Sequence, residues 1–250
     1  MSCILYSWLG APYLESYDPE SITIVRTLNL LNWDFEHQFL MSSDSEPPPE
    51  MELSKYPMIK CQKDGQEVIL SGGVEIMNYL LASLDSEINN SKSDDLEKAR
   101  KFEQWSQDTM KVSNTFFLLK EALNFNELTF SLLQRLGASF DHKEFNTARA
   151  SMVSEIESHE ISEKNYDNVL KLLHSQFQTL ESELGGDGFL LGDKVYAVDL
   201  WLFGNFSLLL LPYNRDANQL KKQFPKTLNY LKRIHERTSS DKTGSLAYLN

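Results

Sequence analysis

Apolar and polar positions alternate in different ways along the first forty residues of the chain. Residues 3–7 form a short apolar run rich in β-favouring side chains, and residues 34–40 alternate apolar and polar positions with a period of two. Between them, residues 18–31 place apolar side chains at helical spacing behind an Asp-Pro-Glu start. The pattern therefore predicts a strand, a helix and a second strand, in this order.

The next stretch predicts a loop, a hairpin and a second helix. Residues 41–56 contain three consecutive prolines and four acids, which indicate an exposed loop. Strands are expected from Pro57 and from Glu67, joined by an Asp-Gly turn, and an amphipathic helix follows and ends near Leu84. The order of elements up to this point is β-α-β-β-β-α.

Helical periodicity takes over in the rest of the chain. Residues 85–95 are polar, with almost nothing to bury, and are interpreted as a linker between a domain at 1–84 and an all-helical domain at 96–250. The helices are expected near residues 94–124, 126–136, 141–159, 163–184, 196–211 and 225–238.

The charge of the 250-residue chain is strongly negative and unevenly distributed. The net charge of −12 argues against a nucleic-acid partner, and a hydrophobic content of 41% excludes intrinsic disorder. From residue 213 onward, eight Lys or Arg accompany three Asp or Glu, a net +5 that leaves −17 for the rest. This basic tail predicts contact with an acidic partner or anionic membrane surface, or simply a solvated last helix that complements its own dipole.

Several kinds of site are not indicated. Cys3 and Cys61 are far apart in sequence and suggest neither a disulfide framework nor a zinc pair, so a reducing compartment is expected. The five histidines lack metal-ligand spacing, so no metal site is expected. The N-terminus signals neither secretion nor matrix import, and the longest apolar run, 200–213, is better read as a buried core helix than as the ~20-residue span a membrane requires.

Three motifs indicate one fold family. Pro57 opens the third strand, Ile76 begins the helical text Ile-Met-Asn-Tyr-Leu, and residues 192–199 read Gly-Asp-Lys-Val-Tyr-Ala-Val-Asp. A small thioredoxin-like β-α-β-β-α domain followed by an all-helical domain, with these motifs, resembles the glutathione-transferase-like architecture. The resemblance implies an α+β fold, a cis peptide bond at Pro57 and a backbone-capping role for Asp199.

The same resemblance bears on glutathione binding. Its enzymes carry an acid followed by Ser just before the helix that contains Ile76, where this chain has Gly72 and Gly73, which have no side chain to hold the γ-glutamyl end of glutathione. Tyr6 and Ser7 lie where a transferase keeps a hydroxyl or thiol, yet in a strand such residues are more often packing residues. We therefore expect no catalytic residue and no cofactor, with a glutathione-dependent transferase of atypical ligand site as the alternative.

A closer resemblance within this superfamily is to the metaxins, subunits of the mitochondrial outer-membrane sorting and assembly machinery. It rests on Leu5-Tyr6-Ser7-Trp8 with Gly10 and on the segments 16–21, 68–76 and 189–199. It implies a non-enzymatic, peripheral subunit at the cytosolic face of that membrane. The implied partners are the barrel-forming assembly subunit, β-barrel precursors and possible pairing with a second metaxin-like subunit. A soluble scaffolding adaptor is a further alternative.

Two surfaces are candidates for partner binding. Trp8 follows the first strand in a loop that contains Gly and Pro, and is the best candidate for an exposed aromatic anchor. Leu9, Tyr13 and Leu14 would complete an apolar patch beside it. The basic tail supplies the second candidate surface, with Lys221, Lys222 and Arg233. An extended precursor segment could also pair with an edge of the sheet.

Overall fold

The structure is a computed structural model, and it describes most of the chain. The described residues are 2–8, 10, 13–40, 56–63, 66–83, 88–89, 95–157, 166–212, 214, 217–240 and 243–249. The expected proline-rich loop, apart from Tyr56, lies outside them, and so does most of the expected linker at 85–95.

Four strands form one mixed sheet in the N-terminal part of the chain. They are β1 (Ser2–Trp8), β2 (Asp34–Leu40), β3 (Met58–Lys63) and β4 (Gln66–Ser71), in the spatial order β2-β1-β3-β4. β1 pairs in parallel with β2 and antiparallel with β3, and β3 pairs antiparallel with β4. The expected strands are confirmed, and the peptide bond before Pro57 is cis, as the resemblance implied.

The pairing of β1 with β3 overturns one expectation. Cys3 and Cys61 lie opposite each other in the register and form a disulfide, although 58 positions separate them in the sequence. The expectation of no disulfide framework is therefore wrong. Sequence spacing could not show it, because only the pairing of the strands brings the two thiols together.

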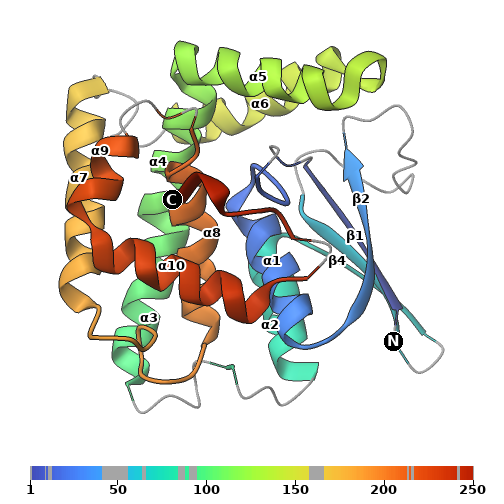
Figure 1. The fold of residues 1–250 in the computed structure, drawn as a ribbon. Helices are drawn as coiled ribbons and strands as arrows, with labels where there is room; N and C mark the ends of the chain where they lie inside the picture. Colours follow the sequence, from blue (N-terminus) through green and yellow to red (C-terminus); the bar gives the residue numbers. More distant parts are fainter. Residues whose placement is uncertain are drawn as a thin grey trace.

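Two helices cover one face of the sheet. α1 (Pro19–Leu30) and α2 (Gly73–Ser83) lie between the sheet and the helical domain in Figure 1. α1 packs against the sheet on one side and against α8 (Ala197–Leu209) on the other, so its residues from Ser21 to Leu28 are all buried. A polar residue such as Arg26 is thus drawn into the centre of the molecule.

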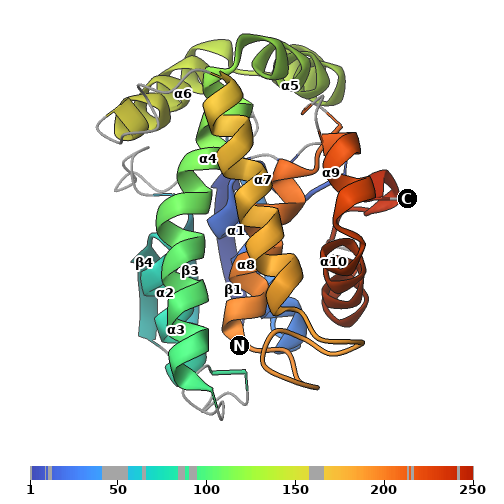
Figure 2. The same cartoon turned by 90° about the vertical axis from the view of Figure 1, so that its left-hand side faces the viewer.

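The rest of the described chain is helical, and Figure 2 shows α3 and α4 continuing one another along one side of the bundle. The expected helix at 94–124 is observed from Leu96 to Lys120, with two π-helical segments, η3 and η4, inside it. Helix α9 was not expected, because residues 213–224 lack a clear apolar period. The elements are α3 (Leu96–Trp105), η3 (Ser106–Met110), α4 (Lys111–Thr115), η4 (Phe116–Lys120), α5 (Ala122–Leu136), η5 (Gly137–Ser139), α6 (His142–Glu157), α7 (Tyr166–Glu183), α8, α9 (Ala217–Gln223), α10 (Pro225–Thr238) and η7 (Ala247–Leu249).

Helix α8 is the core of the helical domain. Every one of its residues is buried, as expected for the apolar run, and Asp199 fixes its start. The Asp199 carboxylate accepts hydrogen bonds from the Tyr196 and Leu190 N–H groups, at 2.8 and 3.0 Å, and from the Tyr230 hydroxyl. The implied capping role is confirmed. None of the helices in the described ranges combines the length and the hydropathy needed to cross a bilayer.

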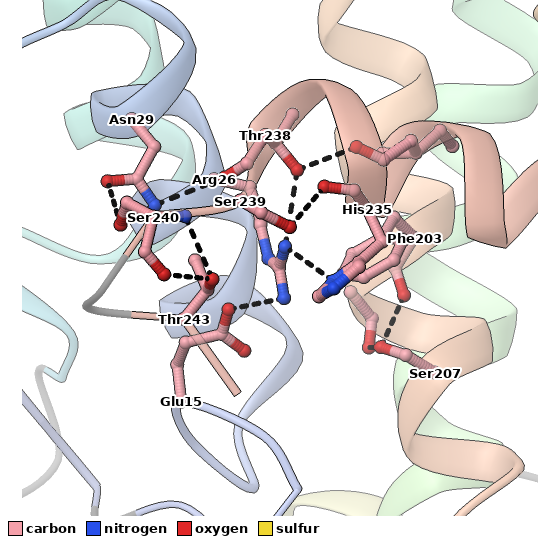
Figure 3. Close-up of polar contacts among 12 residues, drawn as sticks. Glu15, Arg26, Asn29, Phe203, Ser207, His235, Thr238, Ser239, Ser240 and Thr243 are labelled. Atoms are coloured by element: carbon pink, nitrogen blue, oxygen red, sulfur yellow. Dashed lines mark hydrogen bonds and ion pairs between the residues drawn. The ribbon is translucent and has the colours of Figure 1, made fainter. Parts of the chain in front are cut away.

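One buried ionic cluster joins the two domains (Figure 3). Arg26 of α1 lies 2.5 Å from the Glu15 carboxylate, with both side chains fully buried. Its other terminal nitrogen lies 3.0 Å from His235 Nδ1 and 3.3 Å from Thr238 Oγ1, both on α10. The guanidinium also sits 4.6 Å from the ring centre of Phe203 on α8. α1 is therefore fixed to two helices of the other domain.

Candidate functional site

A pocket of about 440 Å³ lies where the two domains meet. The sheet-containing domain contributes Trp8, Tyr56 and the start of α1, and the helical domain contributes α4, η4 and α6. Its described lining consists of Trp8, Tyr17, Asp18, Pro19, Glu20, Tyr56, Lys111, Asn114, Thr115, Leu118, Leu119, Thr147, Ala148, Ser151 and Met152.

The acidic wall of the pocket is the first turn of α1. Asp18 caps this helix: its Oδ2 accepts hydrogen bonds from the Ser21 N–H at 2.7 Å and from the Ser21 hydroxyl at 2.6 Å. Asp18 is buried, and this burial, followed by the charge of Glu20, raises the pKa of its carboxyl to about 6. An aspartate thus occupies the positive end of the α1 dipole at the pocket wall.

Glu20 reaches from α1 to the start of α2. Its Oε2 accepts a hydrogen bond from the Gly73 N–H at 2.8 Å, and its Oε1 lies 2.9 Å from Lys111 Nζ. One carboxylate thereby connects α1, α2 and α4, elements of both domains. The N–H at the start of α2 is already satisfied by a side chain of the same protein.

The contact with Glu20 explains the glycine at position 73. Gly72 has a φ of +85°, which favours glycine, whereas the φ of Gly73 lies outside that left-handed region. A Cβ on Gly73 would lie 2.6 Å from Glu20 Oε2 and 2.7 Å from Glu20 Cβ. A side chain at position 73 would therefore clash with Glu20, which fills the space beside Gly73.

Three aromatic rings form the wall next to the acids. The Trp8 ring lies 6.3 Å from the Tyr17 ring, nearly parallel to it, and 5.4 Å from the Tyr56 ring, edge to face. Trp8 is only 2% exposed, so the expectation of an exposed anchor is wrong. The neighbouring Gly and Pro indicated a loop, but β1 extends through Trp8 and the tyrosines cover its ring. Its role in partner binding stays a prediction.

The electrostatic environment of these rings disfavours negative charge. Burial raises the pKa of Tyr17 well above its ordinary value, with further contributions from Asp18 and Glu144. Burial also raises the pKa of Tyr56 to about 12, and Glu144 contributes in the same direction. Any anion placed beside these hydroxyls would meet the same desolvation and the same carboxylates.

The other loop candidates do not form an open patch. Leu14 is 2% exposed, and the half-buried Tyr13 packs its ring 5.6 Å from the ring of Tyr248 near the C-terminus. Leu9 lies outside the described residues. The expected apolar patch is therefore wrong for Leu14, because this side chain is buried and the neighbouring Tyr13 packs against the C-terminal segment.

The basic candidates are dispersed. Lys221 donates a hydrogen bond to the Tyr248 carbonyl, and Arg233 donates one to the Gly188 carbonyl at 2.8 Å. Both side chains are half-buried and hold segments of the chain together, whereas Lys222 is exposed on α9. Of these three residues Lys222 alone is exposed, and its contact with a partner stays a prediction.

Tyr6 and Ser7 are not among the described residues that line the pocket. Ser7 is fully buried, with its Oγ 2.6 Å from His37 Nε2. Tyr6 is buried too, and this burial raises the pKa of its hydroxyl. The structure therefore buries both residues in β1, and neither belongs to the described lining of the pocket.

Sequence reasoning missed the residues that define the pocket. Asp18 and Glu20 appeared only as the start of a helix, and Lys111 is 91 positions from its partner Glu20. The one available signal was the pair Gly72-Gly73, which was read as a loss of ligand contacts. The structure shows that the Gly73 N–H donates a hydrogen bond to Glu20.

Comparison with known families supports the architecture. Residues 140–238 match the model of the glutathione S-transferase C-terminal domain. No curated protein matches the sequence of the chain. The matched segment covers helices α6 to α10 and includes Asp199.

Solved structures share the whole fold at low sequence identity. Glutathione transferase GSTFuA3 from Phanerochaete chrysosporium superposes with a TM-score of 0.65 at 14% identity, over 96% of this chain and 99% of that one. FzlA from C. crescentus gives 0.59 at 14% identity, over 100% and 99%. A glutathione transferase family member from Pseudomonas fluorescens pf-5, solved with two glutathione bound, gives 0.57 at 16%, over 94% and 88%. The glutathione-transferase-like fold is thereby confirmed.

Proposed function

We propose that this glutathione-transferase-like chain is a non-enzymatic binding subunit that works in the sorting and assembly of β-barrel proteins at the mitochondrial outer membrane. The observation that carries the non-enzymatic part is the hydrogen bond from the Gly73 N–H to Glu20. The chain's own carboxylate occupies a backbone donor at the junction of the domains.

Glutathione is a poor match for such a pocket. It carries two carboxylates, and transferase chemistry also needs a stabilised thiolate. Asp18 and Glu20 already accept hydrogen bonds from backbone N–H groups at the starts of α1 and α2. Lys111 is paired with Glu20. A glutathione anion would therefore meet like charge where it needs donors, at a cost that the apolar walls do not offset.

The mitochondrial part of the proposal is supported by the sequence resemblance to the metaxins. The proposed partners are the barrel-forming assembly subunit, β-barrel precursors and a second metaxin-like chain. β4 is an edge of the described sheet, with Ile69 43% exposed, and it offers backbone groups to an extended precursor segment. The proposed location is the cytosolic face of that membrane, as a peripheral subunit.

Calorimetric titration with glutathione tests the non-enzymatic part. We expect no binding by the wild-type chain at glutathione concentrations up to about 10 mM, a range that covers even weak specific binding. The variant Glu20→Ala leaves the Gly73 N–H without its carboxylate acceptor, and we expect it to gain measurable affinity. Glu75→Ala, an acid of the same α2 turn, is the matched control. Tight binding by the wild type would contradict the proposal.

Native electrophoresis of tagged protein from cell fractions tests the mitochondrial part. We expect comigration with the barrel-forming assembly subunit and release from membranes by alkaline carbonate. A chain that stays alone and soluble refutes this assignment but leaves the non-enzymatic part standing, and it favours the scaffolding adaptor.

A glutathione-dependent transferase is the second candidate function. The observation that favours it is the pocket itself, which lies at the domain junction of a fold shared with a protein solved with glutathione bound. Its sign would be glutathione affinity together with thioether formation from an electrophilic substrate, abolished by a side chain that fills the pocket.

A further inference from the structure

Two acceptor atoms at the pocket have no hydrogen-bond partner among the described residues. Asp18 uses Oδ2 for both of its bonds to Ser21, which leaves Oδ1 without one. The side-chain oxygen of Asn114, a residue 2% exposed, is also without a donor. Both residues line the pocket. Asn114 Oδ1 is a buried acceptor without a donor, which is costly, so its presence in a cavity wall suggests a missing ligand.

The orientation of the Asn114 amide is fixed by its neighbours. Asn205 Nδ2 donates to the Trp201 carbonyl, which can only accept, so Asn205 Oδ1 faces Asn114. Asn114 must then turn its Nδ2 toward Asn205, at 2.8 Å, and its oxygen remains without a donor. Exchanging the two amide atoms would destroy this bond without supplying a partner.

The charge of the described lining favours a cation. Asp18 and Glu20 contribute two carboxylates, and Lys111 is the single basic residue among the lining side chains described. Its ammonium is 2.9 Å from Glu20, which leaves Asp18 as the excess charge. Trp8, Tyr17 and Tyr56 also line the pocket, and aromatic rings attract organic cations through their negative quadrupoles.

We propose that the pocket binds a small organic amine, with its ammonium donating to Asp18 Oδ1 and Asn114 Oδ1 and its apolar body on Leu118, Leu119 and Met152. An alkylammonium has three donors and no acceptor, which suits two acceptors without donors. The pocket volume of about 440 Å³ suits a ligand of modest size. This inference rests on the proposed function only in that glutathione does not fill the pocket.

The test compares two probes of matched shape by calorimetry on the wild-type chain. 4-Phenylbutylamine carries an ammonium, and 4-phenylbutyrate carries a carboxylate on a similar apolar body. We expect the amine to bind about tenfold to a hundredfold more tightly, the range of a hydrogen bond between charged groups. Equal affinities, tighter butyrate binding, or no binding of either probe up to about 10 mM overturns the inference.

Variants locate the site. Asp18→Asn keeps a good helix cap and removes the charge, and we expect it to weaken amine binding about tenfold or more. Asp95→Asn makes the same change at the cap of α3, where Asp95 accepts from the Lys98 N–H, and serves as the matched control. Unchanged amine affinity in Asp18→Asn would place the amine elsewhere.

A second variant covers the case in which Asp18→Asn does not fold. Ser151 is exposed on α6 at the pocket wall, so Ser151→Trp adds a ring at the mouth without removing a buried contact. We expect it to abolish amine binding, and retained binding contradicts this location. Glutathione titration is a separate measurement, so failure of the proposed function and failure of the amine site are distinguishable.

Discussion

Arg26 and Glu15 form a buried ion pair, and the loss of either partner alone would destabilise the protein. Both side chains are fully buried, so each charge depends on the other (Figure 3). Burial lowers the pKa of Arg26 and raises the pKa of Glu15, while their mutual attraction opposes both shifts. Replacing one partner would leave an uncompensated charge in a region of low dielectric.

We therefore expect Arg26→Met to lower the free energy of unfolding by about 3–5 kcal/mol, the usual loss on breaking a buried ion pair. Guanidinium unfolding measures it. The double variant Arg26→Met/Glu15→Leu removes both charges and should recover most of the loss. A double variant as unstable as the single one would show that packing and the bonds to α10, more than charge, set the cost.

His235 makes stability depend on pH. Burial, and then the charge of Arg26, lowers the pKa of its ring to about 4, whereas the unfolded chain titrates near 6.5. The unfolded state thus binds the proton more readily, and the stability contributed by neutral His235 is lost as pH falls from about 6.5 to 4. Asp18 and Asp199, with pKa values raised to about 6, change stability in the opposite direction.

A variant that lacks His235 isolates the contribution of this residue to the pH dependence of stability. We expect His235→Asn to be less destabilised than the wild type when denaturant midpoints are followed from pH 7 down to pH 4. His142→Asn, at an exposed position on α6, controls for the substitution itself. Parallel curves for the wild type and His235→Asn would contradict the assignment.

At the scale of elements, the contact between α1 and α8 depends on one glycine. A Cβ on Gly204 would lie 2.5 Å from the Pro19 carbonyl oxygen and 2.7 Å from Thr23 Oγ1. The first of these atoms is backbone, so the helices must separate to admit a methyl group.

We expect Gly204→Ala to lower the free energy of unfolding by about 1–3 kcal/mol through overpacking, as measured by chemical denaturation. Gly186→Ala is the matched control, because no heavy atom lies within 4 Å of its added Cβ, and it should change stability by less than about 0.5 kcal/mol. A neutral Gly204→Ala would mean that α1 and α8 adjust more easily than their packing indicates.

The elements also show where periodicity misleads. The expected helix at 94–124 and its successor from 126 are divided at Glu121, whose extended backbone ends η4 and precedes α5. Apolar spacing continues across this break, because both segments turn apolar side chains toward the same core. The sequence thus predicted the helices but placed their boundary several residues away.

At the scale of the whole molecule, the domains are too closely connected to unfold separately. α1 is buried between the sheet and α8, and the bonds of Arg26 and Glu20 cross the junction. We expect a single unfolding transition, with coincident midpoints by circular dichroism and by the fluorescence of the four tryptophans, which include Trp8 at the junction and Trp201 in α8. Two separated transitions would show that the interface contributes less stability than its buried contacts indicate.

The sequence by itself determined the order of the elements and the contrast between a strand-containing first part and a helical second part, because side-chain periodicity and helix starts are local. The resemblance added the cis bond at Pro57 and the cap at Asp199, which the structure confirms. Only the tertiary structure decided that Trp8 is buried, that Cys3 pairs with Cys61, and that Glu20 fills the space beside Gly73. Each depends on groups brought together from distant positions, and such proximity leaves no periodic signal in the chain.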